Sequence, residues 1–121
     1  MTVARLAAVL ALFATPALAG PAPGALTAAE VNAQVVGHSV ALEDGSFTWY
    51  YNKGGKYDAD DGRVARSGTY QVRPDGRLCW NDNTGVSGCF QYYRQAGKLH
   101  ARRADPGNSF ELGAVKFGPL P

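Results

Sequence analysis

Hydrophobic and polar residues alternate in short runs through most of the chain from His38 onward. In Phe47–Tyr51, for example, the first, third and fifth residues are bulky aromatics that would share one face of a strand. A period of two residues is typical of a β-strand with one buried face, and turn signals recur at intervals of roughly 8–12 residues. The pattern predicts a mainly β protein, an antiparallel up-and-down meander of about eight strands. It should form a small barrel or a curled sheet, with an open two-layer sandwich as the alternative.

The part of the chain that holds both cysteines predicts three neighbouring strands. Gly68–Val72 and Arg77–Trp80 are separated by a Pro-Asp-Gly turn, which is a β-hairpin signal. A polar, glycine-containing segment, Asn81–Gly88, is predicted to be a loop. The aromatic run Cys89–Tyr93 that follows it is predicted to be the third strand.

The two cysteines, Cys79 and Cys89, should lie on neighbouring antiparallel strands. On each strand the cysteine occupies the face opposite the bulky residues, so both sulfur atoms can point to the same side of the sheet. A disulfide fits this arrangement and would close a loop of about ten residues, stabilising the fold by roughly 2–3 kcal/mol. A free pair or half of a metal site are the alternatives, but no CxxC motif or adjacent histidine supports a metal.

The N-terminal residues 1–19 have the pattern of a bacterial signal peptide. Arg5 forms a short basic region, Leu6–Ala14 is an apolar core, and Ala17-Leu18-Ala19 is an A-x-A cleavage signal. Cleavage between Ala19 and Gly20 would leave residues 20–121 as a single β-barrel-like domain, in the periplasm or outside the cell. Because the apolar core is shorter than the roughly 20 residues that span a bilayer, no stable membrane anchor is expected after cleavage.

One segment, Leu26–Val36, has the pattern of a helix. Thr27 can cap its start, and Glu30 stands three residues later, which is the spacing of a capping box. Val31 and Val35 are four residues apart and therefore share a face. The sequence predicts one short N-terminal amphipathic helix that packs on the sheet or plugs an end of the barrel.

The chain resembles a family of small secreted proteobacterial proteins described as a domain of unknown function. The resemblance lies in the order of its parts: a signal peptide, a short helix, aromatic strands and a region with two cysteines. The most specific pieces of the resemblance are Gly68-Thr69-Tyr70, Leu78-Cys79-Trp80 and Cys89-Phe90, and it extends over roughly the whole mature chain. The resemblance implies a periplasmic lipocalin-like or calycin-like β-fold, and it brings no catalytic residue with it.

Charge and reactive side chains argue against several classes of function. The whole chain has a net charge of only +2 at pH 7, which favours neither nucleic acid nor a membrane surface as a partner. His38 and His100 have no metal ligand at a suitable spacing, and Ser87 lacks the G-x-S-x-G motif of many serine hydrolases. We therefore expect neither an enzyme nor a bound metal or cofactor.

Two polar regions are candidates for contact with a protein partner. The loop between the cysteines is rich in side-chain oxygens, and a basic strip follows on a later strand; loops held by a rigid scaffold often carry recognition. Plain turn chemistry and a solvated sheet face are the alternatives. The candidate residues are Asn81, Asp82, Asn83, Lys98, His100, Arg102 and Arg103.

The inward-facing aromatic residues are candidates for a second kind of site. They can line a ligand cavity, as in lipocalin-like barrels, or they can fill the interior, which is small in a barrel of short strands. The pattern favours a filled core, because these residues fall on the faces that must be buried. The candidate ligand-lining residues are Trp49, Tyr51, Trp80 and Tyr92.

The sequence thus predicts an exported, non-catalytic binding or protein-interaction module, such as an inhibitor or accessory factor of a cell-envelope enzyme. Small disulfide-linked periplasmic β-domains that inhibit lysozyme motivate this expectation, as an analogy of fold class only. The alternative is a carrier of a small apolar or lipid-like ligand in the barrel interior, because that interior is aromatic.

Overall fold

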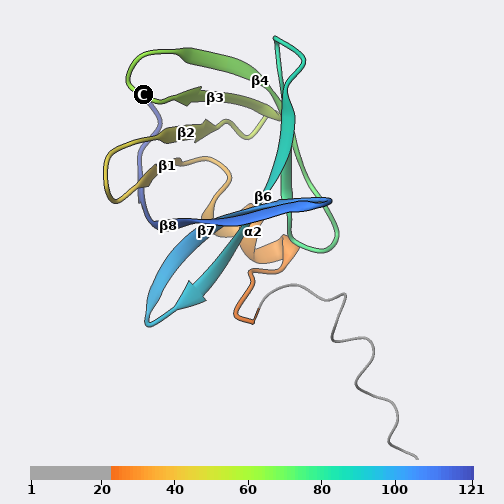
Figure 1. Ribbon diagram of the computed structural model, residues 1–121, viewed down its shortest axis with the longest axis vertical. Coiled ribbons are helices and arrows are strands. Elements are labelled where there is room, and N and C mark those ends of the chain that lie inside the picture. The colour runs from red at the N-terminus through yellow and green to blue at the C-terminus, as the bar shows by residue number, and fades with distance from the viewer. Residues whose placement is uncertain (1–22) are drawn as a thin grey trace, which may run out of the picture.

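The computed structural model describes residues 23–121, which form a closed barrel of eight antiparallel strands (Figure 1). Each strand pairs with the next along the chain, and β8 returns to pair with β1. The predicted meander and its barrel are confirmed, and the open sandwich is excluded. The predicted signal peptide and its cleavage site lie outside the described residues. The strands are β1 (Ser39–Leu42), β2 (Thr48–Tyr51), β3 (Lys56–Asp60), β4 (Ala65–Val72), β5 (Leu78–Asp82), β6 (Ser87–Gln95), β7 (Lys98–Asp105) and β8 (Asn108–Gly118).

The first and last strands close the barrel. Their register runs from Ser39 opposite Gly118 to Leu42 opposite Val115. Each strand therefore has two neighbours, but β8 pairs with β1 only over Val115–Gly118 and with β7 over Asn108–Ala114.

One helix precedes the barrel, α2 (Ala28–Gln34). Its N-terminus is the predicted capping box: Glu30 N donates to Thr27 Oγ1 at 3.2 Å, and Thr27 N donates to the Glu30 carboxylate at 2.9 Å. The helix is shorter than predicted by two residues at each end. A helix of this length is not stable alone, so the burial of Val31 and Val35 against the barrel must hold it. Within residues 23–121 no helix is both long and apolar enough to cross a membrane.

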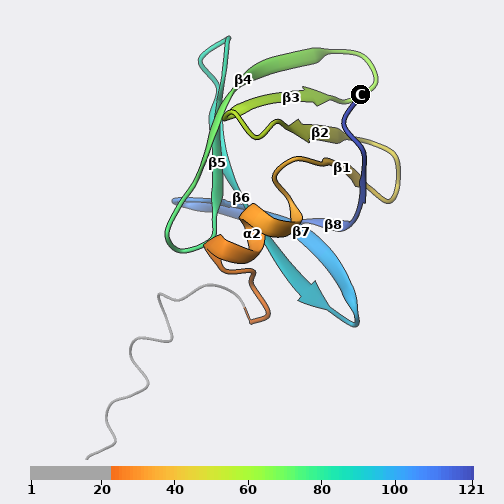
Figure 2. The same cartoon turned by 180° about the vertical axis from the view of Figure 1, so that it is seen from behind.

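The segment before α2 is tied to the barrel wall. Leu26 N donates to the carbonyl oxygen of Tyr92 at 2.8 Å, and Arg94 N donates to that of Gly24 at 2.9 Å. Gly76, in the β4–β5 turn, comes so close that a Cβ there would lie 2.2 Å from the carbonyl oxygen of Leu26. These contacts place α2 across one end of the barrel, which we call the sealed end (Figure 2).

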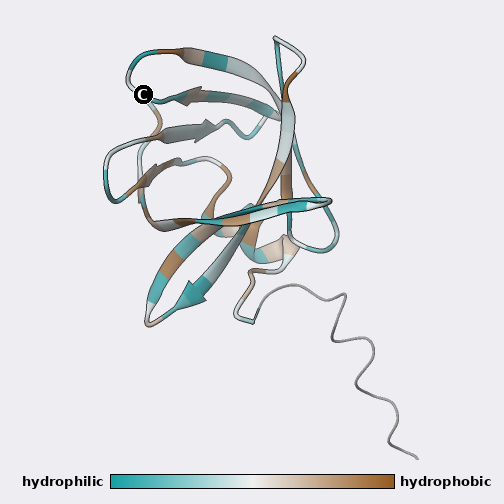
Figure 3. Ribbon diagram, in the orientation of Figure 1, coloured by the Kyte–Doolittle hydropathy of each residue, from teal (hydrophilic) through white to brown (hydrophobic). Residues whose placement is uncertain are grey.

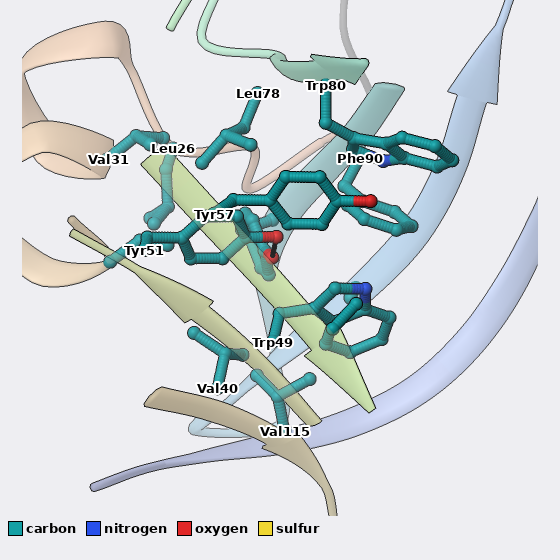
Figure 4. Packing of buried hydrophobic residues seen from close by; sticks show 14 of the residues in the cluster. Leu26, Val31, Val40, Trp49, Tyr51, Tyr57, Leu78, Trp80, Phe90 and Val115 are labelled. Atoms are coloured by element: carbon teal, nitrogen blue, oxygen red, sulfur yellow. Dashed lines mark hydrogen bonds between the residues drawn. The ribbon is translucent and has the colours of Figure 1, made fainter. Parts of the chain in front are cut away.

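Inward-facing side chains fill the barrel next to the sealed end. Hydrophobic and hydrophilic residues alternate along β7 (Figure 3). Tyr51 and Tyr92 are fully buried. Their hydroxyl oxygens are 2.9 Å apart, so the two hydroxyl groups form a hydrogen bond with each other. Figure 4 shows Tyr51 among the surrounding core side chains. Val31, Val40 and Leu78 are fully buried in the same cluster. For this part of the barrel the prediction of a filled core is confirmed.

The disulfide between Cys79 and Cys89 is present, with an S–S distance of 2.07 Å. The two residues lie directly opposite each other on β5 and β6, on the outer face of the barrel. Their neighbours Trp80 and Phe90 point inward, as the alternating pattern predicts. The disulfide therefore joins the two strands that supply these two inward-facing rings.

The predicted loop Asn81–Gly88 is wrong at both ends. β5 continues through Asp82 and β6 begins at Ser87, so the connection is only residues 83–86. The strands extend into this polar stretch because its backbone groups continue the ladder, with Asn81 directly opposite Ser87. A polar sequence therefore does not mark the end of a strand here.

Candidate functional site

The barrel end opposite α2 carries the β1–β2, β3–β4, β5–β6 and β7–β8 connections, and we call it the open end. It contains a pocket of about 200 Å³. The pocket is walled by the rings of Trp49, Tyr57, Trp80 and Phe90, which come from β2, β3, β5 and β6 (Figure 4). Within residues 23–121 no helix lies across this end, and the four rings are nevertheless buried, at 3–7% exposed.

The aromatic walls hold one another in place. Trp49 meets Phe90 edge-on with ring centroids 4.9 Å apart, and Trp80 lies 5.7 Å from Tyr57 and 5.8 Å from Phe90. Phe47 stacks on Trp49 from the rim at 4.8 Å. Edge-on and offset contacts at such distances are favourable, so these rings are positioned before any ligand arrives.

Arg103 enters the pocket from β7. It lies opposite Phe90 in the register, so it faces inward, and its guanidinium carbon is 5.3 Å from the Trp80 ring centroid. Its Nε is 2.9 Å from Asp105 Oδ2. The position opposite Trp80 on β6 is Gly88, where a Cβ would lie 2.5 Å from Arg103 Nη2. The absence of a side chain at Gly88 therefore leaves the space that this guanidinium occupies.

A second arginine lines the pocket beside a buried carboxylate. Arg66 Nη1 is 3.9 Å from Asp82 Oδ2, and the Asp82 side chain is fully buried. Asp82 Oδ1 accepts hydrogen bonds from Thr84 Oγ1 at 2.7 Å, Thr84 N at 2.9 Å and Val86 N at 3.0 Å. The Thr84 hydroxyl, followed by the two amides and Arg66, lowers the pKa of Asp82, so this carboxylate is charged at neutral pH.

Tyr57 is a proton donor of the pocket. Burial, and then the negative charge of Asp82, raise the pKa of Tyr57 to about 12. Arg66 and Arg103 act on this pKa in the opposite direction, so both guanidinium groups are within electrostatic range of the hydroxyl. The Tyr57 hydroxyl therefore keeps its proton at neutral pH and can donate a hydrogen bond.

Exposed apolar side chains gather around the open end. Among the described residues, the large hydrophobic side chains that stand most exposed are Val64, Val86 and Phe110, at 49%, 45% and 46%. Val64 lies in the β3–β4 connection, Val86 in the β5–β6 connection, and Phe110 near the start of β8. Both connections are at the open end, and of the three side chains Val86 lines the pocket.

The predicted ligand-lining residues separate into two pairs. Trp49 and Trp80 line the pocket at the open end. Tyr51 and Tyr92 lie in the filled interior, each fully buried. The residues proposed for one cavity thus divide between a pocket and a core.

The predicted basic strip does not form one free cationic surface. Lys98 Nζ is 3.2 Å from the Glu43 carboxylate, and Arg102 contacts Ser109 and Glu111. His100 stacks on the Tyr93 ring at 5.4 Å. Arg103, which the prediction placed in the same strip, faces into the barrel.

The three candidate residues from the predicted loop, Asn81, Asp82 and Asn83, do not share one environment. Asp82 is buried and organises the turn that follows it, whereas Asn81 and Asn83 are exposed on the outside. Asn83 N donates to the carbonyl oxygen of Ser67 at 2.8 Å, which ties the connection to β4.

A shallow groove of about 750 Å³ lies on the outer face, between Pro23–Gly24 and β6–β8. Its polar groups pair with one another: the Tyr93 hydroxyl donates to the Glu111 carboxylate, which also lies 3.9 Å from Arg102 Nε. Burial, and then this hydrogen bond, raise the pKa of Tyr93 to about 12.

Sequence reasoning missed Tyr57, Arg66 and Arg103 as pocket residues. The signal for Arg103 was present, because Leu99, Ala101 and Arg103 are spaced by two and share a face. No comparable signal existed for Arg66, because the predicted strand of this region begins at Gly68, whereas β4 begins at Ala65.

Among residues 23–121 no group of three or more His, Cys, Asp or Glu side chains is arranged to hold a metal ion. Comparison of the chain with protein-family models, with curated proteins and with solved structures gave no match in any of the three. The resemblance to a secreted lipocalin-like family therefore stays a prediction.

Proposed function

We propose that the protein is a non-catalytic binding module that takes the apolar part of a small molecule into the pocket at the open end of its barrel. The observation that carries this proposal is the preformed aromatic pocket, whose walls are Trp49, Tyr57, Trp80 and Phe90. Pockets of this kind, apolar with a few placed polar groups, are the usual form of small-molecule sites.

The volume limits what the pocket holds. An apolar cavity of roughly 150 Å³ accepts a benzene molecule. The pocket of about 200 Å³ therefore suits one ring or a short branched chain. A long lipid tail does not fit, because Tyr51 and Tyr92 fill the barrel below. The proposal is thus a narrower form of the predicted ligand carrier, with the ligand held at the mouth.

The signal peptide predicted from the sequence and the Cys79–Cys89 disulfide support a setting in the periplasm or outside the cell. Disulfides persist in such oxidising compartments and are rare in the cytosol. We propose this as the place where the ligand is met.

A second candidate function is docking of a protein partner on the open end. The exposed side chains of Val64, Val86 and Phe110 favour it, because apolar groups that gather on a surface often mark an interface. Lys98 and Arg102 do not support this second function, because each is already in an ion pair with a glutamate.

The test uses the two tryptophans of the chain, both of which line the pocket. Titration with 2-phenylacetate and with its neutral amide, 2-phenylacetamide, should change tryptophan fluorescence in a saturable way. Ala59→Leu, which places a larger side chain in the pocket wall, should abolish the change, with circular dichroism and melting temperature as checks on folding.

The matched control is Val64→Ser, which alters the rim outside the pocket lining and should leave the titration unchanged. If neither probe gives a saturable signal with the unaltered protein, the proposed function is wrong. If Val64→Ser instead disrupts capture of a protein partner, the second candidate gains support.

A further inference from the structure

We infer that the pocket at the open end selects an anion, namely a small aromatic or short-chain carboxylate whose charged group meets Arg66 and Arg103. This inference rests on the proposed function and names the ligand class of the same site. It follows from which polar groups the pocket presents and which of them are already engaged.

The two guanidinium groups have unused donors. Arg103 is engaged through Nε with Asp105, and the ion pair of Arg66 is one 3.9 Å contact with Asp82. A guanidinium carries further N–H donors in a planar fork that matches the two oxygens of a carboxylate. Both groups line the pocket, so a ligand carboxylate there can meet donors from two sides.

The two nearby carboxylates are held by the backbone outside the pocket lining. Asp82 Oδ1 accepts from the amides of Thr84 and Val86, and Asp105 Oδ1 accepts from the amide of Cys89. Their Oδ2 atoms face Arg66 and Arg103. Neither aspartate lines the pocket, whereas both arginines do, so the charged groups that a ligand in the pocket would meet are the two guanidinium groups.

The remaining polar groups of the pocket are donors as well. The Tyr57 hydroxyl is protonated at neutral pH. Trp80 is 7% exposed, and its Nε1 is buried without a hydrogen-bond partner among the described residues. A buried donor without a partner is costly, and an acceptor on a ligand would relieve that cost.

A cation is the main competing ligand, because aromatic walls of this kind also bind ammonium groups. Arg103 already occupies the face of Trp80, at 5.3 Å from the ring centroid. A second positive charge in the pocket would be repelled by this group and by Arg66. The aromatic walls therefore serve the apolar body of the ligand, and the arginines serve its charge.

The experiment compares three probes of similar shape by tryptophan fluorescence: 2-phenylacetate, neutral 2-phenylacetamide and cationic 2-phenylethylamine. We expect phenylacetate to bind about tenfold more tightly than the amide, a difference of about 1.4 kcal/mol, and the amine to bind most weakly. Equal binding of phenylacetate and the amide overturns the anion inference and leaves the proposed function standing. Tightest binding of the amine also overturns it, and no binding of any probe overturns both.

Variants that remove one positive charge test which arginine causes the preference for phenylacetate over the amide. Arg66→Gln and Arg103→Gln should each reduce the ratio of phenylacetate to amide affinity severalfold, while the affinity for the amide stays nearly constant. Arg63→Gln is the matched control, because Arg63 is exposed in the β3–β4 connection and is not part of the pocket lining. Arg103→Lys keeps the charge if the glutamine variant folds poorly. An unchanged ratio in Arg66→Gln, and in Arg103→Gln where that variant folds, overturns the inference, whereas Arg103→Lys should keep most of the preference.

Discussion

The two ends of the barrel differ in what covers them and in the polar groups that they contain. At the sealed end, α2 covers the interior, and the polar groups inside satisfy one another, as the hydroxyls of Tyr51 and Tyr92 do. At the open end, inward-facing positions carry charged groups, Arg66 and Arg103, among aromatic rings. The sealed end therefore accounts for stability, and the open end leaves donors and apolar surface available for binding.

The same strands build both ends, so the difference comes from small changes along them. β6 contributes Tyr92 to the filled interior and Gly88 to the open end, only a few residues apart. A large inward residue fills the barrel, whereas a glycine leaves room for Arg103 from the neighbouring strand. Side-chain size at single inward positions thus decides where the core ends and the pocket begins.

The largest expected effect is at the sealed end. Leu26→Ala should lower the free energy of unfolding by about 2–5 kcal/mol, because Leu26 is 1% exposed and its removal leaves a cavity. Val86→Ser at the open end should change it by only about 0.5 kcal/mol, since Val86 is 45% exposed. Urea denaturation of both variants measures the contrast, and equal losses would contradict the division between the two ends.

The next effect appears at alkaline pH. Burial, and then the neighbouring Tyr92, raise the pKa of Tyr51 well above its ordinary value of 10.0. The folded state therefore keeps this proton while the unfolded chain releases it, so stability is full below pH 10.0 and falls as pH rises above it.

The Tyr51→Phe, Tyr92→Phe double variant should flatten this alkaline loss in urea titrations, because it removes both buried hydroxyls together. Removing both leaves neither without its partner, so the cost at neutral pH should be small. A curve as steep as that of the unaltered protein would show that these two tyrosines are not its source. Tyr57 at the open end, with a pKa raised to about 12, would be examined next.

One variant at the open end should combine a small change in stability with a marked change in binding. Gly88→Ala would place its Cβ 2.5 Å from Arg103 Nη2, so the guanidinium must move away from Trp80. Because the end of a flexible side chain can move, stability should change by about 1 kcal/mol or less. The preference for phenylacetate over phenylacetamide should fall severalfold. Ser87→Ala is the matched control. An unchanged preference in Gly88→Ala would show that the position of Arg103 does not determine the selection of anions.

Much of the fold follows from local patterns in the sequence. The alternation of residues predicts the strands and their inward faces, the Thr27 and Glu30 spacing predicts the start of α2, and the opposed Cys79 and Cys89 predict the disulfide. These features depend on neighbours within a few residues or across one hairpin, so the sequence alone determines them.

The site was decided by the tertiary structure. Closure of β1 on β8 sets the interior volume, and the placing of α2 decides which end stays open. The burial of Asp82 and the meeting of Arg66 with Arg103 depend on strands that are distant in sequence, β4, β5 and β7. Alternation with a period of two residues predicts whether a side chain faces into or out of the barrel. It does not predict how far along the barrel axis that side chain lies. Since depth separates a core tyrosine from a pocket tryptophan, only the assembled barrel reveals the pocket.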